Sequence, residues 1–315
     1  MSALVVREAA AADAPGIRAL FGRAFGREMT AEEWRWKFED NPDGWFGTVV
    51  ELAGRIVGNY AGWGMRFLLG GQERLVYAVG DVATDPSVRG LGGRRNAFRL
   101  MTEAFFEEVE GRRGVPFCFG FPGERHLVLG QRVVGTRTVF AIVEKRVPCG
   151  ALPPPPGDSE AGDFVLERFD RLWAAASRAW PALAVRDRAR ANWRFHARPG
   201  RYYRMVWRNG GDGLLGWAVL SVSGEDALVA DYLGRSGDGD DLLPLFAAAG
   251  AEASRLGARR LVFWETPGPA AAVLAELPGE RFSSGFPLDA RGVDEAAIRL
   301  LRERGHLVPA LYDMV

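Results

Sequence analysis

Cysteine and histidine are scarce in this sequence, and neither is spaced for a metal site or a disulfide framework. The 315 residues include two cysteines, Cys118 and Cys149, which are far apart and have no CxxC partner. The three histidines show no metal-ligand spacing. We therefore expect neither a disulfide framework nor a zinc site, and no other metal cofactor.

An excess of charge of one sign and long apolar runs are also missing. Forty basic residues balance forty acidic ones, so the net charge gives no reason to expect nucleic acid as a partner. No stretch approaches the roughly 20 apolar residues of a membrane helix, and residues 1–15 contain no apolar run long enough for a signal peptide. These absences predict a cytoplasmic protein with no membrane partner.

The length and composition fit a globular protein of two domains. Apolar residues make up 48% and charged residues 25% of the chain, and 315 residues suit two domains of about 150 each. Residues 148–162 contain four consecutive prolines, which favour an extended linker. We therefore predict domains at 1–147 and 163–315, joined by a Pro-rich linker at 148–162.

The first domain has the pattern of a mixed α/β sheet. Asp13 and Thr30 are expected to begin two helices, and Glu33 completes a capping box with Thr30. An antiparallel series of strands follows, and then a β-α-β unit with its helix at about 93–110. The expected strands are 4–8, 47–52, 55–63, 65–69, 73–84, 116–121 and 136–146.

The second domain repeats part of this order. The motif Trp34-Arg-Trp-Lys-Phe has an echo beginning at Trp193, and each is followed by two strands joined by a Gly-containing turn. Strand 227–233 corresponds to the long strand 73–84, and a helix at 241–256 and a strand at 260–265 follow it. The loop after 227–233 is acidic, so it would repel a pyrophosphate. We interpret this half as a degenerate copy without a pyrophosphate site.

A glycine-rich turn between a strand and a helix is the most informative motif. Glycines at 90, 92 and 93 would let a phosphate approach the backbone, and Arg89, Arg94 and Arg95 add positive charge. The spacing matches neither a dinucleotide fingerprint nor a P-loop. Local physics leaves two alternatives open, a pyrophosphate cradle or a glycine-rich turn beside a solvated arginine cluster.

The segment from Thr84 to Arg94 resembles the acyl-CoA motif of the GNAT (N-acetyltransferase) superfamily, R/Q-x-x-G-x-G/A. The order of elements in 1–147 is also similar to that fold, and the tandem arrangement resembles its two-domain members. Arg94 departs from the motif, where the family usually has Gly or Ala. The resemblance implies acetyl-CoA as co-substrate. It also implies that the pantetheine arm pairs with the backbone of Val82, Ala83 and Thr84. The pyrophosphate would be held by the loop residues that follow: Arg89, Gly90, Leu91, Gly92, Gly93, Arg94 and Arg95.

Acyl transfer in that family needs a base for the acceptor amine and an acid for the CoA thiolate, with no covalent intermediate. Strand alternation predicts that Tyr77, Val79, Asp81 and Ala83 share one face. Asp81 is the candidate base or binder of the acceptor ammonium; the alternative is a structural aspartate that stabilises the loop. The segment 124–134, which includes a short helix expected at 124–133, lacks the tyrosine that many relatives use as the acid. Tyr77, a distant tyrosine or unaided departure of the thiolate remain as alternatives.

The sequence therefore predicts an N-acyltransferase that carries acetyl from acetyl-CoA to a small-molecule or peptide amine. A non-catalytic acyl-CoA-binding module and a tRNA-dependent aminoacyl transferase are the alternatives, and the second would need a basic groove. The aromatic residues from Trp34 to Phe46 either shape an acceptor pocket or pack as core. The second copy either covers the acceptor site or forms a homodimer.

Overall fold

A computed structural model describes residues 3–90, 93, 96–165, 167–211 and 213–312. The chain forms two compact units. The first comprises Met1–Arg66, Arg74–Thr138 and Asp289–Glu295; the second comprises Phe67–Glu73, Val139–Leu288 and Ala296–Val315. Among the described residues, no helix combines the length and the apolar character that a membrane span requires.

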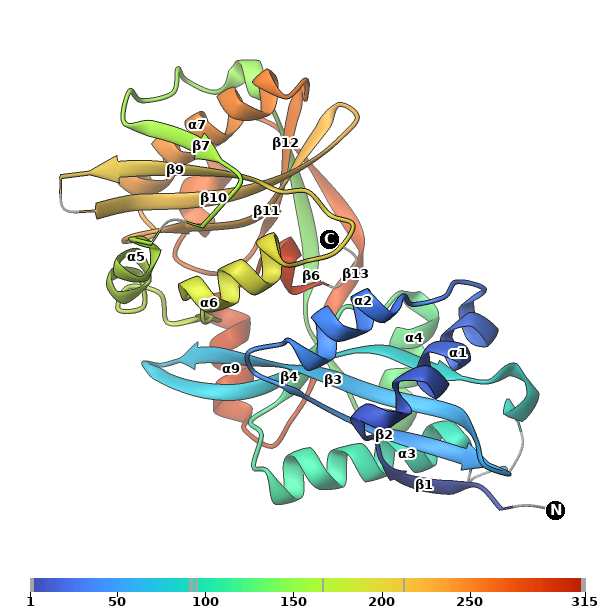
Figure 1. Ribbon diagram of the computed structural model, residues 1–315. Helices are drawn as coiled ribbons and strands as arrows, with labels where there is room; N and C mark the ends of the chain where they lie inside the picture. Colours follow the sequence, from blue (N-terminus) through green and yellow to red (C-terminus); the bar gives the residue numbers. More distant parts are fainter. Residues whose placement is uncertain (1–2, 91–92, 94–95, 166, 212, 313–315) are drawn as a thin grey trace. The chain divides into compact units, whose positions relative to one another are not determined.

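The first unit is built on a mixed sheet (Figure 1). Strands β1, β2 and β3 pair antiparallel, β4 lies beside β3, and β5 runs parallel to β4. Residues 289–291 of β13 pair antiparallel with β5. The strands are β1 (Val5–Glu8), β2 (Trp45–Leu52), β3 (Arg55–Leu69), β4 (Gln72–Thr84), β5 (Cys118–Gly120) and β13 (Glu280–Arg291).

The helices of this unit cover both faces of its sheet (Figure 1). Helices α1 and α2 pack on one face through a cluster with Phe38 and Ala83, and α3 packs on the other through Phe105 and Met101. Thr30 caps α2 in the predicted capping box with Glu33. The helices are α1 (Ala14–Phe25), α2 (Ala31–Trp34), α3 (Ala97–Phe106) and α4 (Glu124–Leu129); π-helical turns extend α2, α3 and α4 at Arg35–Glu39, Glu107–Arg112 and Gly130–Val134.

One predicted strand break is absent. Residues 55–63 and 65–69 were expected as two strands, but β3 runs through Gly64 without interruption. A Cβ at Gly64 would lie 2.3 Å from the carbonyl oxygen of Asp43, and the Gly64 N–H donates to Gly44 at 2.7 Å. This glycine therefore serves the close approach of the turn at 41–44 and does not end the strand.

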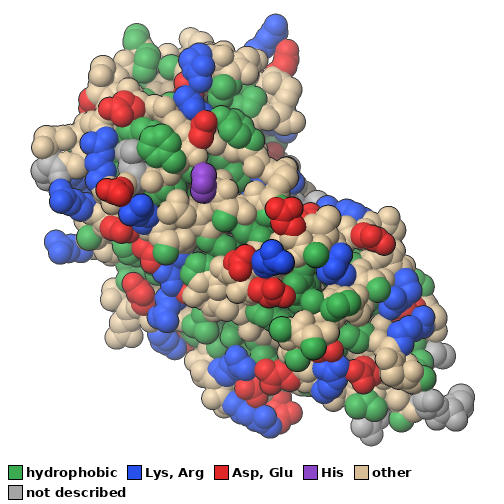
Figure 2. Space-filling view, in the orientation of Figure 1, with side chains coloured by type: hydrophobic (Ala, Val, Ile, Leu, Met, Phe, Trp, Pro, Cys, Tyr) green, Lys and Arg blue, Asp and Glu red, His purple; other side chains and the backbone are tan. Residues whose placement is uncertain are grey.

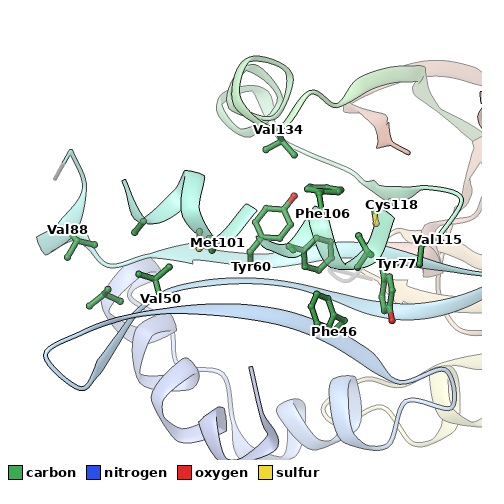
Figure 3. Packing of buried hydrophobic residues seen from close by; sticks show 14 residues of the cluster. Phe46, Val50, Tyr60, Tyr77, Val88, Met101, Phe106, Val115, Cys118 and Val134 are labelled. Atoms are coloured by element: carbon green, nitrogen blue, oxygen red, sulfur yellow. The ribbon is translucent and has the colours of Figure 1, made fainter. Parts of the chain in front are cut away.

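The aromatic run before β2 fills core. The ring of Trp34 lies 4.4 Å from that of Phe38 and 5.6 Å from that of Trp45, in the cluster on the α1/α2 side. Phe46 points to the other face, where Figure 3 shows it beside Tyr77 in the cluster that α3 covers. Packing thus accounts for these side chains.

The second unit has a mixed sheet of its own. Strands β7, β9, β10 and β11 pair antiparallel in that spatial order, β12 runs parallel to β11, and residues 143–148 of β6 pair antiparallel with β12. The strands are β6 (Arg137–Pro148), β7 (Ser159–Gly162), β8 (Ala182–Ala184), β9 (Arg204–Gly210), β10 (Gly213–Ser223), β11 (Asp226–Gly234), β12 (Arg260–Glu265) and β14 (Gly305–His306). The helices are α5 (Phe169–Ala176), α6 (Arg188–Ala191), α7 (Gly239–Arg255), α8 (Ala271–Ala275) and α9 (Glu295–Arg304).

The order of elements in the two units is the same where the repeat was predicted. In the first unit β2, β3 and β4 lead to α3 and to β5 parallel to β4; in the second, β9, β10 and β11 lead to α7 and to β12 parallel to β11. Within the predicted linker, Cys149 is buried and residues 159–162 form β7 beside β9. The boundaries 1–147 and 163–315 stay a prediction.

The chain's two lysines are both buried. Lys37 on the π-helical turn after α2 is 6% exposed and Lys145 on β6 is 3% exposed, whereas all other basic residues are arginines. The Lys145 ammonium donates to the carbonyls of Leu274 and Ala275 at 2.9 and 2.8 Å. Burial lowers the pKa of Lys145, and nearby Glu265 opposes that shift.

Candidate functional site

At Asp81 the alternation of side chains along strand β4 between the two faces of the sheet is interrupted. The backbone φ of Asp81 is +55°, in the left-handed region that non-glycine residues seldom occupy. Tyr77 lies in the core cluster on the α3 side of the sheet, whereas Ala83 lies in the cluster on the α1/α2 side. The prediction that Tyr77, Val79, Asp81 and Ala83 share one face is therefore wrong, because the left-handed residue interrupts the alternation of the strand.

The Asp81 carboxylate is held by a buried cation. Its Oδ2 accepts a short hydrogen bond from Nζ of Lys37, and the two side chains are 11% and 8% exposed. Lys37 Nζ also lies 4.3 Å from the centroid of the Trp63 ring, a cation–π contact. The Asn59 side-chain amide donates to the Asp81 carbonyl at 3.0 Å, which supports the unusual backbone.

Among the residues that the structure describes, two polar atoms beside this pair have no hydrogen-bond partner. They are Oδ1 of Asn59 and Nε1 of Trp63, both buried. Buried polar atoms are nearly always paired in native proteins, so unpaired ones often mark a place where water or a ligand binds. Asp81, Lys37, Asn59 and Trp63 thus form a polar cluster within an otherwise apolar face.

Tyr77 lies elsewhere. Its ring is 2% exposed and packs in the cluster of Figure 3, and its hydroxyl accepts a hydrogen bond from Arg113 at 3.3 Å. Burial raises the pKa of Tyr77, and the hydrogen bond from Arg113 partly offsets that rise. The structure therefore does not bring the two predicted catalytic side chains together: Asp81 contacts Lys37 beside α2, and Tyr77 contacts the α3 side.

Strand β4 leaves its parallel neighbour before the predicted cofactor segment. Its pairing with β5 covers Tyr77–Cys118 and Ala78–Phe119, and residues 79–84 lie beyond it. The predicted arm-binding residues Val82, Ala83 and Thr84 lie in this stretch, which has no parallel partner among the described residues. The Thr84 carbonyl accepts from Nε of Arg89 at 3.3 Å.

The loop after β4 begins with an ordered turn. Asp85 is 3% exposed; its carboxylate accepts from the backbone and the hydroxyl of Ser87 and pairs with Arg23 at 2.6 Å. Gly90 and Gly93 have φ of +82° and +52°, which glycine adopts without strain. Arg89 and Gly90 are exposed.

Helix α3 begins after this loop. Asn96 caps it by accepting from the N–H of Arg99 at 3.0 Å. Four of the predicted phosphate-binding residues lie outside the described residues: Leu91, Gly92, Arg94 and Arg95.

Asp85 links the stability of this loop to pH. Burial acts to raise its pKa, but the hydrogen bonds from Ser87 and Arg23 and the charge of Arg55 outweigh it and lower the pKa to about 2. A carboxyl whose pKa falls on folding stabilises the protein above its unfolded pKa, and that contribution is lost as the pH falls toward the folded value.

We expect Asp85→Asn to lower the free energy of unfolding by about 2 kcal/mol at pH 7 and by roughly half that at pH 3. Urea unfolding at both pH values measures the difference, and Asp40→Asn, at an exposed carboxylate, is the control. A loss that is equal at the two pH values would contradict the assignment.

Lys37, Asn59 and Asp85 are site residues that the sequence analysis missed. Lys37 lies inside an aromatic run that was interpreted as an acceptor pocket or as packing without regard to its charge, although a lysine is rare in this arginine-rich chain. A glycine directly before Asp81 was the available signal for an irregular strand. No sequence signal pairs Lys37 with Asp81, which is 44 residues away.

Comparisons with known proteins agree with this architecture. A family model described as acetyltransferase (GNAT) domain matches residues 5–128. No curated protein matches the sequence.

Solved structures with the same fold are distant in sequence. A probable N-acyltransferase of unknown function from Enterococcus faecalis V583 is 14% identical with a TM-score of 0.70, covering 95% of this chain and 74% of its own. A GCN5-related N-acetyltransferase from Anabaena variabilis is 12% identical with a TM-score of 0.70, covering 96% and 75%. The N-myristoyltransferase of Saccharomyces cerevisiae, solved with bound myristoyl-CoA, is 9% identical with a TM-score of 0.58, covering 92% and 82%.

The order of strands in the first unit agrees with the family match. Residues 5–128 of this chain match the model of the GNAT acetyltransferase domain, and the chain shares the fold of these solved structures.

Proposed function

We propose that the chain transfers an acetyl group from acetyl-CoA directly to the amine of a small molecule or peptide. The observation that carries this proposal is the separation of β4 from β5 after Ala78. It leaves residues 82–84 without a parallel partner in the part of the chain that the structure describes, beside a loop with left-handed Gly90 and Gly93. An extended amide-containing ligand can pair with such a strand, and backbone N–H groups of the loop can bind phosphate.

In the proposed reaction the acceptor nitrogen attacks the thioester carbonyl, the C–S bond breaks, and the amine loses a proton. Asp81 is the side chain that we propose to bind the acceptor ammonium or to take its proton. Tyr77 is buried against Arg113, which speaks against its reaching a thiolate. We therefore propose that the CoA thiolate leaves without a protein acid.

A second function has one observation in its favour. The Asp81 carboxylate already accepts a hydrogen bond from Lys37, and a carboxylate held this way is a weaker base than a free one. A non-catalytic acyl-CoA-binding module would be compatible with that arrangement. Acetyl-CoA turnover in the presence of an amine library distinguishes the two, since the module would bind without turnover.

The face of the molecule shown in Figure 2 has no continuous basic patch that would favour a nucleic-acid substrate. On the face shown in Figure 2, Lys and Arg side chains are interspersed with Asp and Glu. We propose a cytoplasmic location, which suits the two free, buried cysteines. The amine screen would identify the acceptor. A mass measurement in solution would show whether the chain forms a homodimer.

Binding is the first test. We expect isothermal titration with acetyl-CoA to give micromolar affinity, about −8 kcal/mol, and Gly92→Asp to abolish it by placing a carboxylate in the proposed phosphate site. Gly211→Asp adds the same charge at an exposed position with open space around it and should leave affinity unchanged. If Gly92→Asp binds as the parent protein does, the loop is not the cofactor site.

A further inference from the structure

The two units have an equivalent point at which a strand separates from its parallel neighbour. In the first unit the last pair involves Ala78, and Asp81 follows three residues later. In the second unit the pairing of β11 with β12 ends at Leu228, and Asp231 again follows three residues later. By this count, residues 232–234 correspond to 82–84, the stretch proposed to pair with the cofactor arm.

In the second unit this opening is filled by the protein itself, through residues 305–308, called here the inserted segment. Nε2 of His306 donates to the carbonyl of Tyr232 on β11 at 3.0 Å. The next backbone N–H, of Leu307, donates to Oγ1 of Thr266, which directly follows β12, at 3.4 Å. His306, Leu307 and Val308 are each 0% exposed. The inserted segment is thus bonded both to β11 and to the residue that follows β12.

A second ring donates a hydrogen bond to the backbone carbonyl two residues further along β11. Nε1 of Trp180 donates to the carbonyl of Gly234 at 3.0 Å, and the Trp180 ring lies 4.3 Å from that of His306. The His306 and Trp180 rings therefore donate hydrogen bonds to the carbonyls of residues 232 and 234. These two carbonyls point the same way because alternate residues of an extended strand do so. Their counterparts in the first unit are the carbonyls at 82 and 84.

The phosphate end of the second unit is also occupied. The Asp238 carboxylate accepts hydrogen bonds from the backbone N–H groups of Asp240 and Asp241 at the start of α7. A fixed negative charge at a helix N-terminus takes the place that a bound phosphate would take. In the first unit the cap at the start of α3 is the neutral side chain of Asn96.

We propose that the second unit is self-liganded: His306 and Trp180 take the strand carbonyls that the cofactor arm would use, and Asp238 takes the helix N-terminus that the pyrophosphate would use. One chain accordingly binds one acyl-CoA. That the excluded ligand is acyl-CoA rests on the proposed function. That the protein's own side chains fill the opening does not.

The occupation is tested by chemical rescue. His306→Gly removes the ring and its hydrogen bond, and we expect the unfolding midpoint to fall by roughly 5–10 °C. Imidazole at about pH 8, where it is neutral, should restore part of that loss because its N–H can donate to the Tyr232 carbonyl. 1-Methylimidazole has no N–H in its neutral form and should restore less.

Phe246→Ala is the matched control, since it empties another fully buried site of the same unit and should not respond to imidazole. A His306→Gly protein with the parental midpoint, or with the same response to both imidazoles, would overturn the proposal. Should that variant not fold, Trp180→Phe removes the N–H donor together with part of the indole and keeps an aromatic ring. Amide hydrogen exchange in 305–308 should then be at least about tenfold faster, and unchanged exchange would overturn the proposal.

The titration stoichiometry separates this inference from the proposed function. One acetyl-CoA per chain supports both, and two per chain overturn the self-liganded second unit. No binding at all sinks the proposed function, and the imidazole result then decides the second unit by itself.

Discussion

Arg186→Met is expected to lower the free energy of unfolding of the second unit by about 3–5 kcal/mol. Nε of Arg186 lies 2.9 Å from both carboxylate oxygens of Asp231, and each residue is 4% exposed. The carboxylate also accepts from the N–H of Tyr232 at 2.8 Å. Removing the arginine leaves a buried carboxylate without its cation, which is far more costly than never burying the pair.

The double variant Arg186→Met, Asp231→Leu should recover most of that loss, because apolar side chains of similar volume replace both charges. Burial already raises the pKa of Asp231, with Arg186 opposing that rise, so the single variant should protonate Asp231 more readily. Urea unfolding of the full chain measures the series. Arg188→Met, at an arginine that is 42% exposed, should cost less than about 1 kcal/mol. If the single variant costs no more than this control, the buried pair does not contribute as described.

Asp81→Asn is expected to lower the turnover number by about 10²–10⁴-fold while changing acetyl-CoA affinity by less than about threefold. Asparagine keeps the size of the side chain and tolerates the left-handed backbone, but it can neither accept a proton nor hold an ammonium. The effect should therefore appear in turnover and in the KM for the amine, not in cofactor binding. Steady-state kinetics and titration with acetyl-CoA give the two quantities separately.

Lys37→Met is the companion variant, because it removes the cation and leaves the carboxylate in place. If Asp81 takes the acceptor's proton, the acidic limb of the pH–rate profile should move to higher pH in this variant, since the carboxylate loses the partner that favours its charged form. Glu32→Gln, at an exposed position of α2, controls for charge. Equal losses of turnover and cofactor affinity in Asp81→Asn would show that Asp81 only shapes the strand.

The element order was predictable because it rests on periodicity and capping. Thr30 and Glu33 form the capping box, and α3 follows the strand that carries Asp81. The face of the sheet on which Asp81 lies was not predictable from strand alternation alone. A single left-handed residue reverses which side chains point to each face without changing the apolar composition of the strand. A glycine at position 80 was the local hint.

Long-range pairing set the other limit. Lys37 meets Asp81 across 44 residues and Arg186 meets Asp231 across 45, and the spacing of charges along the chain encodes neither contact. From the sequence, the acidic loop of the second half was expected to repel a pyrophosphate. The structure adds that Asp238 caps the helix there, a role that requires knowing where the helix begins.

The burial of both lysines has a chemical consequence for a protein proposed to handle thioesters. Acyl thioesters modify exposed lysine amines without any enzyme, and arginine is not a comparable nucleophile because its guanidinium stays protonated. With Lys37 at 6% and Lys145 at 3% exposure, this chain offers no accessible lysine side chain to such a donor. Its lysine side chains are therefore shielded from such acylation, and labels that react with lysine side chains should find almost nothing to modify on the folded protein.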